Sequence, residues 1–215
     1  MMTDNTNAGD AAVVETHPWQ PFIPPKAKVL IMGTFPPGRH RWSMDFYYPN
    51  RTNDFWFMMG LIFKGDKDAF YNREKRLFDL DRIKELLTEK GIALHDTCRK
   101  IRRLKGNASD KYLEVVEPVP LFRLLSLMPE CRTISTTGEK AATVIADLTG
   151  TPVPKMGTEV IYNDSSTGKE LHIWRMPSTS RAYPLSLEKK ADYYRQLFAD
   201  AGILPSLTET AGNHI

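Results

Sequence analysis

A run of four apolar residues, Val29 to Met32, is the feature that most constrains the fold of this 215-residue chain. Lys28 precedes the run, Gly33 ends it, and a loop rich in proline and glycine follows as far as Gly38. A short apolar run bounded in this way is typical of a strand that is buried on both faces of a sheet. In α/β proteins, ligands bind beyond the carboxyl ends of such strands. The run therefore predicts a parallel sheet with a site at the edge where this strand ends.

The rest of the chain alternates between strand and helix patterns. Apolar periodicity predicts helices at 55–63, 79–90, 120–128, 139–148 and 186–201, and short apolar runs predict strands at 92–94, 132–136, 159–162 and 171–174. Alternating strands and helices favour a sheet that is covered on both faces. We therefore expect a three-layer α/β/α fold with a central, mainly parallel, four-stranded sheet. One domain at residues 20–204 would form it, between flexible tails at 1–19 and 205–215.

Charge and composition limit the classes of partner. Residues 1–17 and 205–215 contain four acidic residues and no Lys or Arg, so the remainder has 29 basic and 22 acidic residues. A moderately basic core is compatible with a polyanionic partner, and ordinary surface charge is the alternative. No apolar run approaches the ~20 residues that span a membrane, and residues 1–17 lack the pattern of a secretory signal. We expect a cytoplasmic protein.

Common motifs for cofactors, metals and nucleophilic hydrolysis are missing from the sequence. Gly33 and Gly38 do not form a G-x-G-x-x-G fingerprint, and there is no P-loop and no G-x-S-x-G. The five histidines show neither H-x-H nor H-E-x-x-H spacing, and the two cysteines, Cys98 and Cys131, do not make a cluster of ligands. We therefore expect neither a cofactor nor a metal.

Four loops that follow predicted strands form the candidate site, at 33–38, 95–97, 136–138 and 176–180. The carboxyl ends of parallel strands share one edge of a sheet, so these loops should converge on one crevice. A dense basic stretch from Arg99 to Lys105 follows the second loop. This stretch either contacts phosphates or forms a solvated surface.

In this order, the segments resemble motifs of the uracil-DNA glycosylase superfamily. They are Gly33-Thr-Phe-Pro-Pro-Gly38, Tyr47-Tyr-Pro-Asn-Arg-Thr-Asn-Asp-Phe-Trp56, Gly91-Ile-Ala-Leu-His-Asp96 and Met176-Pro-Ser-Thr-Ser180. The hypoxanthine-DNA glycosylase branch, to which the mismatch-specific uracil-DNA glycosylases are related, has G-S-F-P-G, Y-Y-x-x-P-x-N-x-F-W, G-I-A-L-W-D and L-P-S-T-S. The resemblance covers residues 29–204 and implies the fold of this superfamily.

The resemblance also implies roles for particular residues. Hydrolysis of a base from its deoxyribose needs a flipped nucleotide, a base pocket and a positioned water. Asn53 would orient that water, and capping of the following helix is its structural alternative. The base pocket would comprise Gly33, Thr34, Phe35, Pro36, Tyr48, Phe55 and Thr137. The DNA contacts would come from Ser178, Thr179, Ser180, Arg181 and Tyr183.

Within these sets the resemblance gives some side chains a specific contact. Phe35 and Tyr48 would stack on the base, with core packing as the alternative. Arg181 would hold a phosphate and Tyr183 would fill the gap in the duplex, with a solvated turn as the alternative.

The sequence departs from the family pattern at several of these positions. Met176 stands where the classical uracil enzymes have a His, and Thr137 stands where many relatives have an Asn. Phe35 leaves the first loop without a polar side chain. The iron–sulfur branches of the superfamily need four cysteines, and this chain has only two, so it cannot belong to them. These departures bear on which base is recognised.

The expected function is a monofunctional DNA glycosylase that removes uracil or hypoxanthine from DNA and acts as a monomer without a cofactor. No lysine lies in the matching motifs to form a Schiff base, so no strand nick is expected. Two alternatives remain. One is a catalytically weak or inactive nucleic-acid-binding protein with the same fold, and the other is an α/β enzyme that acts on a free nucleotide or nucleoside.

Overall fold

The computed structural model describes residues 13–104 and 112–206. Predictions for residues 1–12, 105–111 and 207–215 lie outside the described residues, and these include most of both tails and the end of the basic stretch. The strands are β1 (Val14–Thr16), β2 (Val29–Gly33), β3 (Tyr71–Asn72), β4 (Leu77–Phe78), β5 (Ile92–Asp96), β6 (Cys98–Arg103), β7 (Leu113–Pro118), β8 (Thr133–Thr137), β9 (Thr158–Asp164) and β10 (Lys169–Met176). The helices are α1 (Phe55–Lys64), α2 (Leu80–Lys90), α3 (Leu121–Ser126), α4 (Glu139–Thr149) and α5 (Leu187–Asp200), with a short 3-10 helix at Arg39–Arg41.

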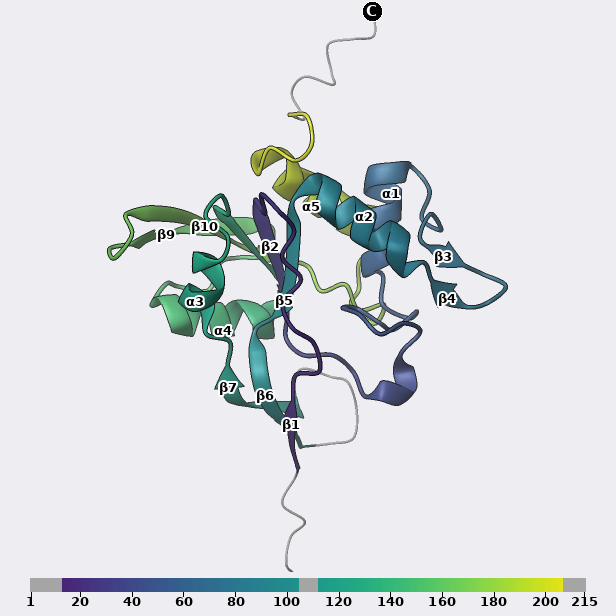
Figure 1. Cartoon of the computed structure of the whole chain (residues 1–215), viewed down its shortest axis with the longest axis horizontal. Helices are drawn as coiled ribbons and strands as arrows, with labels where there is room; N and C mark the ends of the chain where they lie inside the picture. Colours follow the sequence, from purple (N-terminus) through teal and green to yellow (C-terminus); the bar gives the residue numbers. More distant parts are fainter. Residues whose placement is uncertain (1–12, 105–111, 207–215) are drawn as a thin grey trace, which may run out of the picture.

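The central sheet has the strand order β5-β2-β8-β10-β9. In Figure 1, β5 and β2 lie beside each other, with β10 and β9 to their left. The first four strands run parallel, and β9 pairs with β10 in the antiparallel direction. The predicted fold class is confirmed, but the sheet has five strands rather than four. The fifth strand arises because a tight turn folds β9 back along β10: the carboxylate of Asp164 accepts hydrogen bonds from the backbone and hydroxyl of Ser166, at 2.9 and 2.6 Å.

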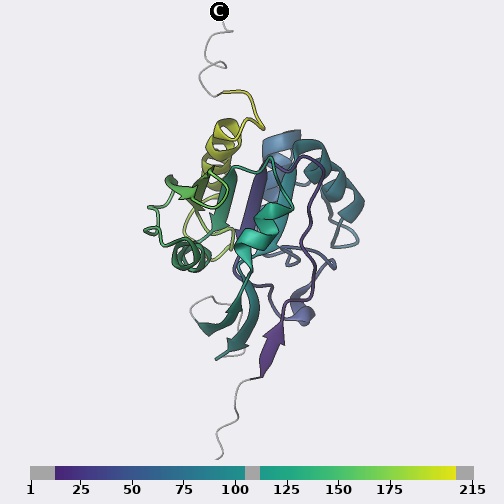
Figure 2. The ribbon, with the colours of Figure 1, turned by 60° about the vertical axis from the view of Figure 1, so that its left-hand side comes forward.

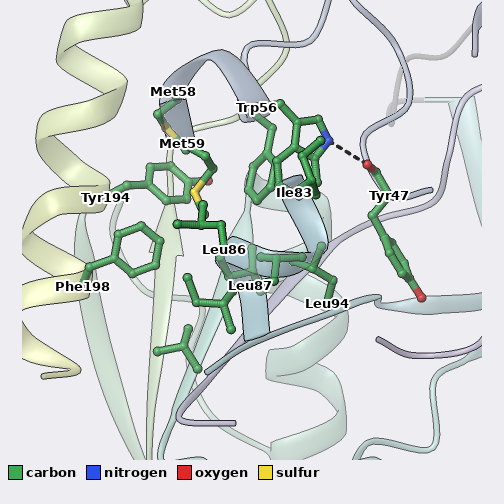
Figure 3. Close-up of a cluster of buried hydrophobic side chains, with 14 of the residues drawn as sticks. Tyr47, Trp56, Met58, Met59, Ile83, Leu86, Leu87, Leu94, Tyr194 and Phe198 are labelled. Carbon is green, nitrogen blue, oxygen red and sulfur yellow. Dashed lines mark hydrogen bonds between the residues drawn. The ribbon is translucent and has the colours of Figure 1, made fainter. Parts of the chain in front are cut away.

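Successive side chains of each buried strand point to opposite faces of the sheet, so there is one hydrophobic core on each face. On β2, Val29 and Ile31 pack against α1, α2 and α5, whereas Leu30 and Met32 pack against α3 and α4. The sheet therefore lies between two helical layers (Figure 2). In the first core, Met58 and Met59 of α1, three residues of α2 and two aromatic residues of α5 meet side by side (Figure 3).

Local sequence signals set the ends of the helices. The Asp79 carboxylate accepts from the Arg82 backbone N–H at 3.1 Å and starts α2, and Gly91, at φ 65°, ends it. The Ser186 hydroxyl accepts from the Lys189 N–H at 3.2 Å and starts α5. Short polar side chains are preferred at helix starts because they satisfy free N–H groups, and glycine tolerates the left-handed conformation at helix ends.

A second, three-stranded sheet has the order β1-β6-β7. The folded domain therefore begins earlier than predicted, because residues 14–16 pair with β6 instead of belonging to a flexible tail. The basic stretch is strand β6 as far as Arg103. Its side chains pair with acids on the neighbouring strands: Arg99 and Lys100 with Glu117, Arg102 with Glu114, and Arg103 with Glu15. Cross-strand ion pairs of this kind stabilise a strand that has few apolar residues.

In the part of the chain that the structure describes, no helix is long and apolar enough to cross a membrane.

Candidate functional site

The four loops of the candidate site meet at one edge of the central sheet, as the sequence predicted. Gly33 at the end of β2 is in register with Asp96 at the end of β5, and Thr137 at the end of β8 is in register with Met176 of β10. Because these strands are parallel, the segments that follow them leave the sheet on the same side. Residues 63 and 39 positions apart in sequence are thereby placed on neighbouring strand ends.

Three side-chain oxygens surround the Cα of Gly33. A Cβ at this position would lie 2.6 Å from Asp96 Oδ1, 3.4 Å from the Tyr48 hydroxyl and 3.6 Å from Thr137 Oγ1. Any larger residue would therefore displace the Asp96 carboxylate. The Tyr48 hydroxyl and Thr137 Oγ1 are 3.3 Å apart and share a hydrogen bond. Glycine is required here for close approach rather than for backbone conformation.

Tyr48 and Phe55 form the aromatic wall next to these oxygens. Their rings stack with centroids 3.8 Å apart and an interplanar angle of 16°. Tyr48 adopts a left-handed backbone conformation, at φ 52°, which non-glycine residues rarely do and which often marks a functional constraint. Burial and the nearby Asp96 carboxylate raise the pKa of the Tyr48 phenol well above its usual value. The hydroxyl is therefore protonated and can donate a hydrogen bond.

The first loop divides into two parts. Thr34 is buried, and its carbonyl accepts from the Cys98 N–H at 3.2 Å, so it stays at the edge of the sheet. Phe35 lies against the second sheet, with its ring 5.4 Å from that of His17 and 5.7 Å from the Arg103 guanidinium. The Pro36 carbonyl accepts from Arg103 at 2.6 Å. Gly33, Thr34, Tyr48, Phe55 and Thr137 are thus brought together, whereas Phe35 and Pro36 lie against the neighbouring sheet.

Asn53 is located at the start of α1. Its Oδ1 accepts from the Phe55 backbone N–H at 2.9 Å, but the N-cap residue of α1 is Asp54, so the N-cap role predicted as the structural alternative falls on the next residue. A short β-bridge pairs Asn53 with Ser180, and the Asp54 N–H donates to the Thr179 carbonyl at 2.8 Å. The Asn53 loop and the 177–180 loop are therefore joined through the backbone. In the described residues, the side-chain NH₂ of Asn53 donates no hydrogen bond.

A buried ion pair reinforces this junction. Lys190 of α5 is fully buried, and its ammonium donates to Asp54 Oδ2 and to the Ser180 carbonyl, both at 2.8 Å. The other Asp54 oxygen accepts from Arg181 Nε at 3.1 Å. One carboxylate thus links α5, the start of α1 and the residue after the 177–180 loop. Sequence reasoning missed Lys190, which looked like one of several lysines on a helical surface.

The predicted DNA-contacting residues line one turn. Ser178 Oγ accepts from the Ser180 N–H at 3.2 Å, and Thr179 is buried. Arg181 is exposed, whereas the Tyr183 hydroxyl donates to the sulfur of Met156 at 3.0 Å. In this conformation the Tyr183 hydroxyl is held against the segment before β9 instead of projecting into solvent. Gly138, at φ 105°, lies against Ser178 and allows the two loops to approach.

Asp96 lies in the predicted 95–97 loop, but sequence reasoning assigned it no role in the site. Its Oδ2 accepts from His17 Nε2 at 2.9 Å, and His17 Nδ1 in turn accepts from the Trp19 N–H at 3.2 Å. His17 comes from the segment that was predicted to be a flexible tail, so this contact could not be foreseen. The available signal was a carboxylate two residues after the apolar run 92–94. His17 fixes one oxygen and leaves Oδ1 beside Gly33 and Tyr48.

His95 contacts Tyr47, the residue before Tyr48, and so supports the site indirectly. Its Nδ1 lies 2.8 Å from the Tyr47 hydroxyl, which itself donates to the Gln20 carbonyl at 2.9 Å. Burial, and then the neighbouring His17, lower the pKa of His95 to about 4. His95 is therefore neutral near pH 7 and fixes the aromatic segment that leads to Tyr48. Among the described residues, no group of three or more His, Cys, Asp or Glu is arranged to hold a metal ion.

Comparison with known proteins adds information on the fold. No family model matches the chain, and no curated protein matches it. Among solved structures, it is similar to the solution NMR structure of a putative uracil DNA glycosylase from Methanosarcina acetivorans, with a TM-score of 0.59 and 19% sequence identity. The match covers 88% of this chain and 99% of that one. The chain therefore has the three-layer fold of that protein over most of its length.

Proposed function

We propose that this protein is a DNA glycosylase that hydrolyses the N-glycosidic bond of a deaminated base, uracil or hypoxanthine, without a metal or cofactor. The observation that carries the proposal is the junction of the Asn53 loop with the 177–180 loop at the carboxyl edge of the sheet. It sets an amide side chain next to a turn of small hydroxyl residues that suits a DNA backbone. The similarity in fold to a protein described as a putative uracil DNA glycosylase agrees with this proposal.

Asn53 would orient the attacking water. The sugar becomes cationic as the base departs, so the water needs positioning more than deprotonation, and a neutral amide is sufficient. The hydrogen bond from the Phe55 N–H holds the side chain in one orientation and leaves its NH₂ group free to donate. This structural contact and the catalytic role are therefore compatible. The start of α1 would fix the amide before substrate binds, which lowers the entropic part of the barrier.

Asp96 would distinguish deaminated bases from their parents. Uracil and hypoxanthine carry a ring N–H next to the carbonyl that deamination creates, whereas cytosine and adenine have a bare ring nitrogen at that position. A carboxylate accepts hydrogen bonds but cannot donate them, so Asp96 Oδ1 would bind the ring N–H and repel the bare nitrogen. The protonated Tyr48 hydroxyl could donate to the base carbonyl beside it. This acceptor and donor pair matches a lactam edge.

A substrate panel tests the proposal. Duplexes with a single uracil opposite guanine or adenine, or a single hypoxanthine opposite thymine, are incubated with enzyme, and alkali then reveals abasic sites on a denaturing gel. We expect cleavage only after alkali treatment, because a monofunctional enzyme leaves the strand intact. No product on any duplex at micromolar enzyme would refute the proposed reaction. Salt-dependent DNA binding without base release would identify a non-catalytic DNA-binding protein instead, and turnover of free nucleosides with indifference to DNA would identify a nucleoside enzyme.

A further inference from the structure

A pocket of about 460 Å³ lies beside the Asn53 loop. Its walls come from the start of α1, the segment that leads into the β3–β4 hairpin, and the turn after the 177–180 loop. Thr52 and Asp54, the two sequence neighbours of Asn53, both line it. Its charged lining consists of four cationic side chains and two carboxylates, namely Arg51, Lys67, Arg73, Arg181, Asp54 and Asp68.

The two carboxylates in this pocket already have protein partners. Asp68 accepts from Arg73 Nε at 2.9 Å. Asp54 is bound by the buried Lys190 at 2.8 Å as well as by Arg181. The buried Lys190 thus balances the charge of Asp54. The charge of Arg181 therefore adds to the net positive charge of the pocket.

Two cations in the pocket have no ion-pair partner among the described residues, although the charge of Lys67 helps to lower the pKa of Glu188. Arg51 and Lys67 are exposed, and within residues 13–104 and 112–206 neither side chain forms an ion pair. They come from different loops, 16 positions apart, and the fold places both on the same concave surface. Holding like charges together in a concave site is unfavourable without a bound anion, and it strengthens the attraction for one.

Arg181 is already oriented on the pocket wall. Its side chain is 55% exposed, and its guanidinium donates from Nη2 to the Arg51 carbonyl at 3.3 Å and lies 5.6 Å from the centre of the Phe57 ring. These contacts hold the planar group and leave other N–H donors free. A guanidinium presents five N–H donors, so an anion can bind without breaking the contact to Asp54.

The basic stretch of strand β6 is a weaker candidate for a polyanion. Its described cations pair with Glu15, Glu114 and Glu117 at 2.7 to 3.3 Å. The cations that are adjacent in sequence on β6 are therefore ion-paired, whereas Arg51 and Lys67, which come from different loops, form no ion pair in the described part of the chain.

We propose that this pocket binds a backbone phosphate of the DNA strand that carries the target base, next to the flipped nucleotide. The inference rests on the proposed function, because it takes DNA as the ligand. A phosphodiester carries one negative charge and two free oxygens, which match the Arg51, Lys67 and Arg181 donors. Because Thr52 and Asp54 flank Asn53, a phosphate held here sets the distance between the backbone and the Asn53 amide.

The test measures DNA binding and base release separately in wild type and in the Arg51→Ala/Lys67→Ala variant. The ligand is a fluorescent duplex of undamaged sequence, titrated at several salt concentrations, so binding is scored without catalysis. Loss of a phosphate contact lowers the slope of log Kd against log salt by about 1 and weakens binding by roughly tenfold near 0.1 M salt. Lys28→Ala/Arg123→Ala removes the same two charges from exposed positions outside the pocket and serves as the control.

The proposal predicts weaker binding and a smaller salt slope for the pocket variant, with the control close to wild type. It is overturned if the pocket variant keeps the wild-type affinity and slope, or if both variants weaken equally, which would indicate general charge attraction. It is also overturned if the wild type does not bind DNA at all. A wild type that binds with the expected slopes but releases no base would contradict the proposed reaction alone and would support the pocket as a DNA-binding surface. Melting temperatures of all three proteins show whether each variant is folded.

Discussion

Removal of the Lys190 ammonium should strongly destabilise the fold. Lys190→Met keeps the length of the buried chain but leaves Asp54 Oδ2 and the Ser180 carbonyl without their donor. Breaking a buried ion pair costs about 3–5 kcal/mol, because the remaining charge stays out of water. Asp54 keeps its contact with the half-exposed Arg181, so we expect the lower end, about 3 kcal/mol. For a chain of this size, this lowers Tm by roughly 6–12 °C.

The double variant Asp54→Asn/Lys190→Met separates this mechanism from a simple packing defect. It removes the unpaired carboxylate together with its cation, so we expect it to recover a large part of the loss, about 2 kcal/mol. Urea unfolding followed by tryptophan fluorescence measures both variants, with equal m-values required for a two-state comparison. A single variant that loses less than about 1 kcal/mol, or a double variant less stable than Lys190→Met, would refute the buried-pair reasoning.

Two further changes test the surroundings of the site. Asp96→Asn should reduce discrimination between uracil and cytosine, because an amide can turn its NH₂ toward a bare ring nitrogen. We expect the ratio of the single-turnover rates on the two bases to change by an amount equivalent to about 2 kcal/mol. An unchanged ratio would show that Asp96 does not recognise the base. His95→Gln should remove a stability loss in acid. The folded pKa of about 4 lies below the unfolded value near 6.5, so the His95 contribution is complete above pH 6.5 and is lost as the pH falls toward 4. Its size is about 3 kcal/mol, and it is measured as the difference between the unfolding free energies of wild type and variant across this pH range. A constant difference would show that His95 does not titrate as described.

The sequence predicted the central sheet because its strands have a simple signal. Residues such as Val29 to Met32 and Ile92 to Leu94 are apolar on both faces, so a short run identifies each strand, and parallel pairing then places the strand ends together. The second sheet has no such signal. Strand β6 buries only Cys98 and Ile101, its other residues are arginine or lysine, and it is stabilised by ion pairs to acids on β1 and β7. Pairing of this kind becomes visible only when the partner strands are known.

In the candidate site, too, contacts within one segment could be predicted from the sequence, whereas contacts between distant segments could not. Asn53, Tyr48 and Phe55 come from one continuous segment, and their proximity follows from the start of a helix. The contacts of His17 with Asp96 and of Lys190 with Asp54 join residues 79 and 136 positions apart. Local pattern cannot determine which of many charged residues is buried, because burial depends on how distant loops cross.

Base release by Asn53→Ala is the most direct test of the central claim. Single-turnover rates are measured at saturating enzyme on duplexes containing uracil or hypoxanthine, beside wild type and Asn50→Ala. Asn50 is a matched control, since its Oδ1 accepts from the Thr52 N–H and hydroxyl in the same loop. We predict that Asn53→Ala loses about 10²–10⁴-fold in rate and only about 1 kcal/mol of stability through the lost hydrogen bond to the Phe55 N–H, while Asn50→Ala stays within a few-fold of wild type. An Asn53→Ala protein that releases the base at the wild-type rate would contradict the account.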